Sequence, residues 1–198
     1  MMCLRLAAAA LLAASTLACS EPPHKEMNQA QGALDAAKAA GAEAFAPAEY
    51  RDARNLLDQS DQAVTQRDYR LALRYALEAR ERATEAARAA GDQKAEARGR
   101  AERSLVTTEN VIRDAETRLT QPAFAKLRTR DLAPVRQAIA DTRDALQKAR
   151  AAMQKEAYLD VAPIVEPAQA RLSAALQDLS TREARRPVRA RRPGRGSR

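Results

Sequence analysis

Residues 69–90 read YRLALRYALEARERATEAARAA, and this stretch decides the fold class. Apolar side chains recur along it at alternating intervals of three and four residues, which places them in one stripe along a helix. The stripe consists of Tyr69, Ala72, Ala76, Ala79, Ala83, Ala86 and Ala90. Because alanine is the best helix former and buries little surface, the pattern predicts a helix that approaches its neighbours closely.

The stripe recurs 89 residues later in the chain. Its second copy is Tyr158, Val161, Val165, Ala168, Leu172, Ala175 and Leu179. The preceding segments align at the same offset, with Ala53, Leu56, Leu57, Ala63 and Val64 matching Thr142, Ala145, Leu146, Ala152 and Met153. Ala-rich helices can resemble each other through composition alone, but the matched tyrosines and the unbroken register favour a duplicated helical unit.

Each expected unit also has an Ala-Pro pair near the start of the helix that precedes the stripe. The pairs are Ala46-Pro47 and Ala133-Pro134. Proline is tolerated in a first helical turn, where the N–H groups have no partner inside the helix, so both pairs predict helix starts. Two units are few for a repeat array, which favours a compact bundle or a stack of hairpins over a long solenoid.

The fold class that we expect is all-α, without a β-sheet: an elongated helical bundle of two similar helical-hairpin units, stacked as in tetratricopeptide proteins. Gly41 is expected to end the first helix, Asp68 to cap the third, and Pro163 with Pro167 to kink the last helix or delay its start. The polar bridge 92–104 is rich in helix formers, which favours continued helix over a linker. The expected helices cover 25–40, 47–66, 69–90, 105–119, 131–154 and 157–180.

The N-terminus has the pattern of an export signal. Arg5 is followed by an apolar run over residues 6–17, much shorter than the roughly 20 residues that span a bilayer. The run ends in Thr16-Leu17-Ala18-Cys19, which resembles the lipobox of bacterial lipoproteins, although that pattern places Leu where Thr16 stands. The resemblance implies cleavage before Cys19 and acylation of its thiol; the alternative is an ordinary secretory signal cut elsewhere. Ser20 implies sorting to the outer membrane, facing the periplasm.

The formal charge of +8 is concentrated at the C-terminus. Residues 181–198 hold eight arginines and one acid, whereas residues 19–180 are balanced. Such a segment has little to bury and is expected to be disordered. Its candidate contacts with an anionic envelope polymer, lipopolysaccharide or peptidoglycan, are Arg185, Arg186, Arg189, Arg191, Arg192 and Arg195. The alternative is a solubilising tail without a specific ligand.

These features predict five segments. They are a signal peptide over 1–18, a lipid-anchored tether over 19–26, a first helical unit over 27–102, a second over 103–180 and an Arg-rich tail over 181–198. Cys3 would leave with the signal peptide, so the mature chain would have no cysteine pair for a disulfide.

The stretch from Gln29 to Ala90 resembles the domain-of-unknown-function 4398 family of bacterial envelope lipoproteins. The residues that carry the resemblance are Ala36, Ala39, Gly41, Ala42, Ala46-Pro47, Ala53 to Leu57, Asp68-Tyr69, Ala72 and Ala76. The family pattern implies a helix that begins with Ala-Pro, a short Asp-Tyr turn and an Ala-rich return helix. It implies no settled biochemical role, and the peptidoglycan-binding domain of some relatives has no counterpart in this sequence.

The sequence predicts a binding or structural protein rather than an enzyme, with no cofactor, no metal and no nucleic-acid partner. His24, the single histidine, has no second metal ligand near it in sequence. Nucleophile-elbow, P-loop and HExxH motifs are absent from the sequence. Two functions remain: a helical module that contacts another envelope protein or itself, and a binder of anionic polymer through the tail.

Overall fold

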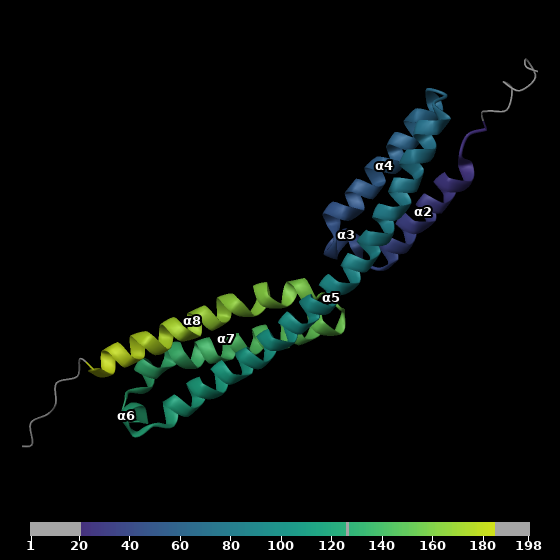
Figure 1. Cartoon of the computed structure of the whole chain (residues 1–198). Coiled ribbons are helices and arrows are strands. Elements are labelled where there is room, and N and C mark those ends of the chain that lie inside the picture. Colours follow the sequence, from purple (N-terminus) through teal and green to yellow (C-terminus); the bar gives the residue numbers. More distant parts are fainter. Residues whose placement is uncertain (1–20, 126, 185–198) are drawn as a thin grey trace, which may run out of the picture. The chain divides into compact units, whose positions relative to one another are not determined.

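The computed structural model describes residues 21–125 and 127–184 (Figure 1). Seven helices and no strand occur among these residues, which confirms the prediction of an all-α fold. The predicted lipid-attachment residue Cys19 and the tail arginines lie outside the described residues. The chain divides into two compact units between Lys94 and Ala95. The boundary predicted from the sequence lies after residue 102.

Unit 1, residues up to Lys94, contains three helical segments that pack side by side (Figure 1). They are α2 (His24–Ala39), α4 (Pro47–Thr65) and the first part of α5 (Tyr69–Thr120), with a single turn, α3 (Ala42–Phe45), between α2 and α4. Helix α2 begins at His24, inside the predicted tether. Gly41 ends it as predicted, with a left-handed φ of 89° and its N–H donating to the carbonyl of Lys38.

The predicted alanine stripe forms the centre of unit 1. Six alanines of α5 are fully buried: Ala72, Ala76, Ala79, Ala83, Ala86 and Ala90. Larger side chains from the other two helices, among them Leu34, Tyr50 and Leu57, belong to the same buried core. Alanine on one helix thus meets leucine and tyrosine on its neighbours, and this size match lets the backbones come close without cavities.

Unit 2, residues from Ala95 onward, also contains three long helical segments. They are the second part of α5, α7 (Thr129–Gln154) and α8 (Tyr158–Ala184), with a single turn, α6 (Pro122–Ala125), after α5. The buried core here is larger in side-chain volume, and Val135, Val161, Val165 and Leu172 are almost completely buried. Ion pairs Glu109–Arg150 and Glu116–Arg143 join α5 to α7 at the surface.

The turn before the stripe has the same backbone structure in both units. Arg67 and Glu156, which are 89 residues apart, are the only non-glycine residues with a positive φ in the described chain, at 61° and 58°. In unit 1 the N–H groups of Arg67 and Asp68 donate to the carbonyls of Val64 and Ala63; in unit 2 the residues at the same offset make the same two bonds. Both turns are Schellman motifs, so the repeat predicted from sequence is also a repeat of structure.

Each unit also has a hydrogen bond between its first and third helical segments, with donors at equivalent positions and acceptors at different ones. Arg80 donates to Gln29 at 2.7 Å in unit 1, and Gln169, 89 residues after Arg80, donates to Thr108 at 2.6 Å in unit 2. Buried positions of the middle helix match at the same offset, as the pairs Tyr50/Ile139, Ala53/Thr142, Leu57/Leu146 and Ser60/Ala149. The two units therefore share packing as well as turn geometry.

Two predicted helix starts differ from the structure. Pro47 is the first residue of α4 as predicted, whereas α7 begins at Thr129, two residues before the predicted start at 131, with Pro134 inside the helix. The buried side chain of Leu132 packs in the unit 2 core and holds the extra turn in place. Helix α8 begins at Tyr158, so the delayed start expected from Pro163 and Pro167 is wrong.

The predicted bridge 92–104 is helical, because α5 runs without a break through both units over 52 residues. Asp68 caps the start of this helix as predicted: its carboxylate accepts the N–H of Leu71 at 3.0 Å. At the other end of the chain, α8 continues to Ala184, past the predicted end at Ser180. The ion pair Asp178–Arg182 at 2.7 Å supports this additional turn, and it raises the pKa of Arg182 through the hydrogen bond.

Candidate functional site

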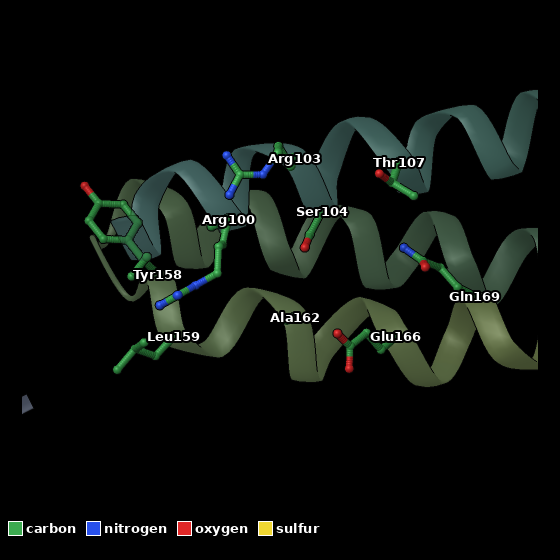
Figure 2. Close-up of a pocket in the computed structure, with 11 residues that line it drawn as sticks. Arg100, Arg103, Ser104, Thr107, Tyr158, Leu159, Ala162, Glu166 and Gln169 are labelled. Atoms are coloured by element: carbon green, nitrogen blue, oxygen red, sulfur yellow. The ribbon is translucent and has the colours of Figure 1, made fainter. Parts of the chain in front are cut away.

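A groove lies between α5 and α8 in unit 2 (Figure 2). It encloses about 460 Å³. Its lining residues, which define the α5–α8 groove, are Ala97, Arg100, Ala101, Arg103, Ser104, Thr107, Tyr158, Leu159, Ala162, Glu166 and Gln169.

Small side chains form the floor of the α5–α8 groove. Ala97 and Ala101 on α5 are buried, and Ala162 on α8 is partly buried. Leu159 stands at one end with half of its surface exposed, next to the ring of Tyr158 (Figure 2). Because these alanines are small, α5 and α8 lie close together below the groove, and Ala162 is the floor residue that remains partly exposed.

Charged and polar groups form the two walls. Arg100 and Arg103 project from α5, and Glu166 projects from α8 (Figure 2). Arg100 is already bound to Glu96 at 2.6 Å. Within the described residues, Arg103 and Glu166 make no hydrogen bond or ion pair with another side chain. They are one positive and one negative group that a bound partner could engage.

The polar groups at the bottom of the groove hold its two helices together. The Oγ1 of Thr108 donates to the carbonyl of Ser104 at 2.6 Å and accepts from the Nε2 of Gln169, also at 2.6 Å. Thr108 is fully buried, so this pair fixes the spacing of α5 and α8. No buried side-chain nitrogen or oxygen in the described chain lacks a hydrogen-bond partner.

A second groove lies at the corresponding end of unit 1. It encloses about 490 Å³ and is lined by Glu21, Pro23, Arg67, Asp68, Tyr69, Arg70 and Leu73. Tyr69 and Tyr158 are equivalent in the repeat, as are Leu73 and Ala162. The two tyrosines that open the predicted stripes therefore both begin a helix and line a groove.

The pKa of Arg98 is raised, first by its hydrogen bond to Glu102 and then by the charge of that carboxylate. No group of three or more potential metal ligands occurs among the described residues. His24 is exposed at the first position of α2, and its backbone N–H donates to the carbonyl of Pro22. None of the described helices is long and apolar enough to cross a membrane.

The sequence analysis did not predict the α5–α8 groove. Its floor alanines follow from composition, but the groove exists only because unit 2 leaves the α5–α8 side uncovered, which is a tertiary property. One signal was available: Leu159 lies off the apolar stripe of α8, and such a leucine is left exposed by a helix that buries only its stripe.

The fold and the grooves together define a class of protein, the all-α bundle built from repeated three-helix units with a Schellman turn before an apolar stripe. Residues 25–104 match the family model of the domain of unknown function DUF4398. The match confirms the resemblance predicted from sequence and covers unit 1 with the first part of the α5–α8 groove. Neither a curated protein nor a solved structure matches the chain significantly.

Proposed function

We propose that this protein is a non-enzymatic lipoprotein of the cell envelope, anchored through Cys19, whose helical units bind a helical segment of another protein. The anchor is supported by the apolar run and the Thr16-Leu17-Ala18-Cys19 sequence. Acylated in this way, the protein would be held at the outer membrane, facing the periplasm.

The α5–α8 groove is the observation that carries the interaction role. Its floor of alanines accepts a close helix, Leu159 offers an exposed apolar contact at one end, and Arg103 with Glu166 offers unpaired charges on opposite walls. A helix with small residues on one face, flanked by charges complementary to these two, is the ligand that fits this surface.

Site-specific photo-crosslinking in cells tests the interaction. A photoreactive amino acid at position 159 is expected to capture a protein partner, whereas the same group at Arg136, an exposed position of α7 outside the groove, is not. Ala162→Arg fills the groove floor without entering the buried core and should abolish the product at 159. Equal products at 159 and 136, or insensitivity to Ala162→Arg, would contradict the proposed role.

The anchor is tested separately. Intact-mass measurement of the mature protein from membranes should show a diacylglycerol and a further acyl chain on Cys19, and Cys19→Ser should release the protein from the membrane fraction. A mature protein with a free thiol at Cys19 would refute the lipoprotein assignment while leaving the groove intact.

The concentration of arginine at the C-terminus favours a second candidate, a binder of anionic envelope polymer. A suitable truncation point is the end of α8 at Ala184, because the last ion pair of this helix uses Arg182. Truncation after Ala184 therefore removes the candidate arginines without shortening the helix. Unchanged sedimentation with peptidoglycan or lipopolysaccharide after this truncation would refute the candidate.

A further inference from the structure

The start of α2 and the turn between α4 and α5 lie at the same end of unit 1 (Figure 1). Glu21 and Pro23, just before α2, line one groove together with Arg67, Tyr69 and Leu73 of the turn and α5. The α4–α5 turn and the N-terminal start of α2 therefore lie at the same end of unit 1.

The distance from this end to the proposed anchor is fixed by covalent geometry. Glu21 is two residues after Cys19, and two peptide links span at most about 8 Å. A lipid on Cys19 would therefore keep this end of unit 1 near the membrane, while the side chains at this end would decide whether the turn enters the headgroup layer.

The side chains at this end suit a lipid headgroup layer. We define the tip surface as Arg67, Tyr69, Arg70, Leu73 and Arg74. Leu73 is 38% exposed and the three arginines are exposed. Tyrosine prefers the boundary between water and lipid, arginine binds phosphate, and an exposed leucine adds apolar area. Leu77, one turn further along α5 and 40% exposed, continues the apolar edge.

The acidic groups near the tip surface do not neutralise its positive charge. Asp68 uses its carboxylate to cap α5 through the N–H of Leu71, and Glu21 is the other acid that lines the groove. Glu78 lies 3.9 Å from Arg74, but at the solvent surface such a pair is weak. Three arginines thus face two groove-lining acids, of which one is engaged by the backbone.

Unit 2 shows that the fold does not require these residues. At the equivalent positions it has Glu156 for Arg67, Leu159 for Arg70, Ala162 for Leu73 and Pro163 for Arg74. The first turn of α8 contains Asp160, which suits the positive end of a helix dipole, whereas the first turn of α5 has Arg70 and no acid. Arginine at a helix start is unfavourable for the helix itself, so its presence points to an anionic ligand.

We propose that the tip surface docks into the phospholipid headgroup layer of the membrane that holds the Cys19 anchor. The inference rests on the proposed acylation of Cys19. Arg67, Arg70 and Arg74 contact lipid phosphates, while Tyr69 and Leu73 enter the boundary with the acyl chains.

A spin label tests the docking in the acylated full-length mature protein. Gln66→Cys places the label on the turn beside the tip surface, and Ala44→Cys places a matched label in α3, at the opposite end of unit 1. Both positions are exposed, and the acylated Cys19 cannot react with the label. The protein is reconstituted in vesicles of phosphatidylethanolamine with phosphatidylglycerol, and the collision rate of each label with a water-soluble nickel reagent is measured.

The label at 66 is expected to collide with nickel at least about twofold less often in vesicles than the label at 44. The double variant Arg67→Glu with Leu73→Ala installs the residues that unit 2 carries, so it should keep its fold by circular dichroism while the protection at 66 is lost. Vesicles of phosphatidylcholine alone should give weaker protection, because their headgroups carry no net charge.

Equal nickel accessibility at 66 and 44 in protein whose mass shows acylated Cys19 would overturn the docking and leave the lipoprotein proposal standing. Protection at 66 that survives the double variant would also overturn it, since the tip surface would then not be responsible. A mass that shows unacylated Cys19 would instead remove the proposed function and the docking together.

Discussion

The side-chain hydroxyl of Ser60 donates a hydrogen bond of 2.8 Å to the backbone carbonyl of Ala72, which joins α4 to α5 next to the α4–α5 turn. Ser60 is fully buried. In unit 2 the equivalent position is Ala149, so the repeat accepts either residue.

Replacing Ser60 with alanine is expected to lower the free energy of unfolding by about 1 kcal/mol, the usual contribution of such a bond. The loss stays small because the carbonyl of Ala72 keeps its partner within α5. Urea denaturation followed by circular dichroism measures the change. A loss above about 3 kcal/mol would show that the position has a larger role than one hydrogen bond.

The two Schellman turns predict a pair of stabilising substitutions. Arg67 and Glu156 adopt left-handed φ angles, which cost a non-glycine residue about 1–2 kcal/mol. Arg67→Gly should stabilise the protein by about 0.5–1 kcal/mol, because glycine removes this strain but adds freedom to the unfolded chain. Glu156→Gly should stabilise it less, because this change also removes a carboxylate that interacts with Arg98. Thermal and urea unfolding measure both.

Replacing Gly41 tests the same backbone effect in the opposite direction, because here a glycine with a positive φ is removed. Its φ is 89°, and an added Cβ would lie 3.3 Å from the ring of Phe45. Gly41→Ala should destabilise by about 1 kcal/mol or more. If all three substitutions shifted stability in the same direction, backbone strain would not be the cause.

Ala83 and Leu172 occupy the same place in the two stripes and are both fully buried. Ala83→Leu should destabilise by about 1–3 kcal/mol, because the larger side chain separates helices that are in close contact. Leu172→Ala should cost about 2–5 kcal/mol, because it leaves a cavity. Chemical denaturation of the two variants measures the contrast, and a neutral result for Ala83→Leu would mean that the unit 1 helices are less tightly packed.

Gly91 tests the continuity of α5. An added Cβ there would meet nothing within 4 Å, so the position has no steric need for glycine. Gly91→Ala should stabilise the helix by about 1 kcal/mol, as should the matched change Gly32→Ala in α2. Hydrogen exchange of amides near position 91 should slow in the variant. Stabilisation at 32 without any at 91 would indicate that α5 is not helical there in solution.

Much of the fold could be predicted from the sequence because the helices bury a single periodic stripe. The stripe from Tyr69 to Ala90, the cap at Asp68 and the chain reversal at Gly41 are local patterns with one structural outcome each. The repeat offset of 89 residues, found by comparison of residues alone, also locates Arg67 and Glu156 in identical turns.

The remaining features depend on contacts that the local sequence does not reveal. The bridge 92–104 is not one of these features, because its helix formers predicted continued helix; ion pairs such as Arg98–Glu102 at 2.8 Å support the segment. Helix α7 was expected to begin at 131, near Pro134, whereas it begins at Thr129 with Leu132 packed in the unit 2 core. The α5–α8 groove required knowledge of which helix faces stay uncovered.

Helix α5 supplies one of the three long helical segments of each unit without an interruption between them. Neither half of it can melt without fraying the other across the boundary at Lys94, since helix propagation is cooperative. The two units should therefore denature as a coupled system, with a calorimetric enthalpy that belongs to both. A stabilising ligand bound to either one would raise the melting temperature of its neighbour.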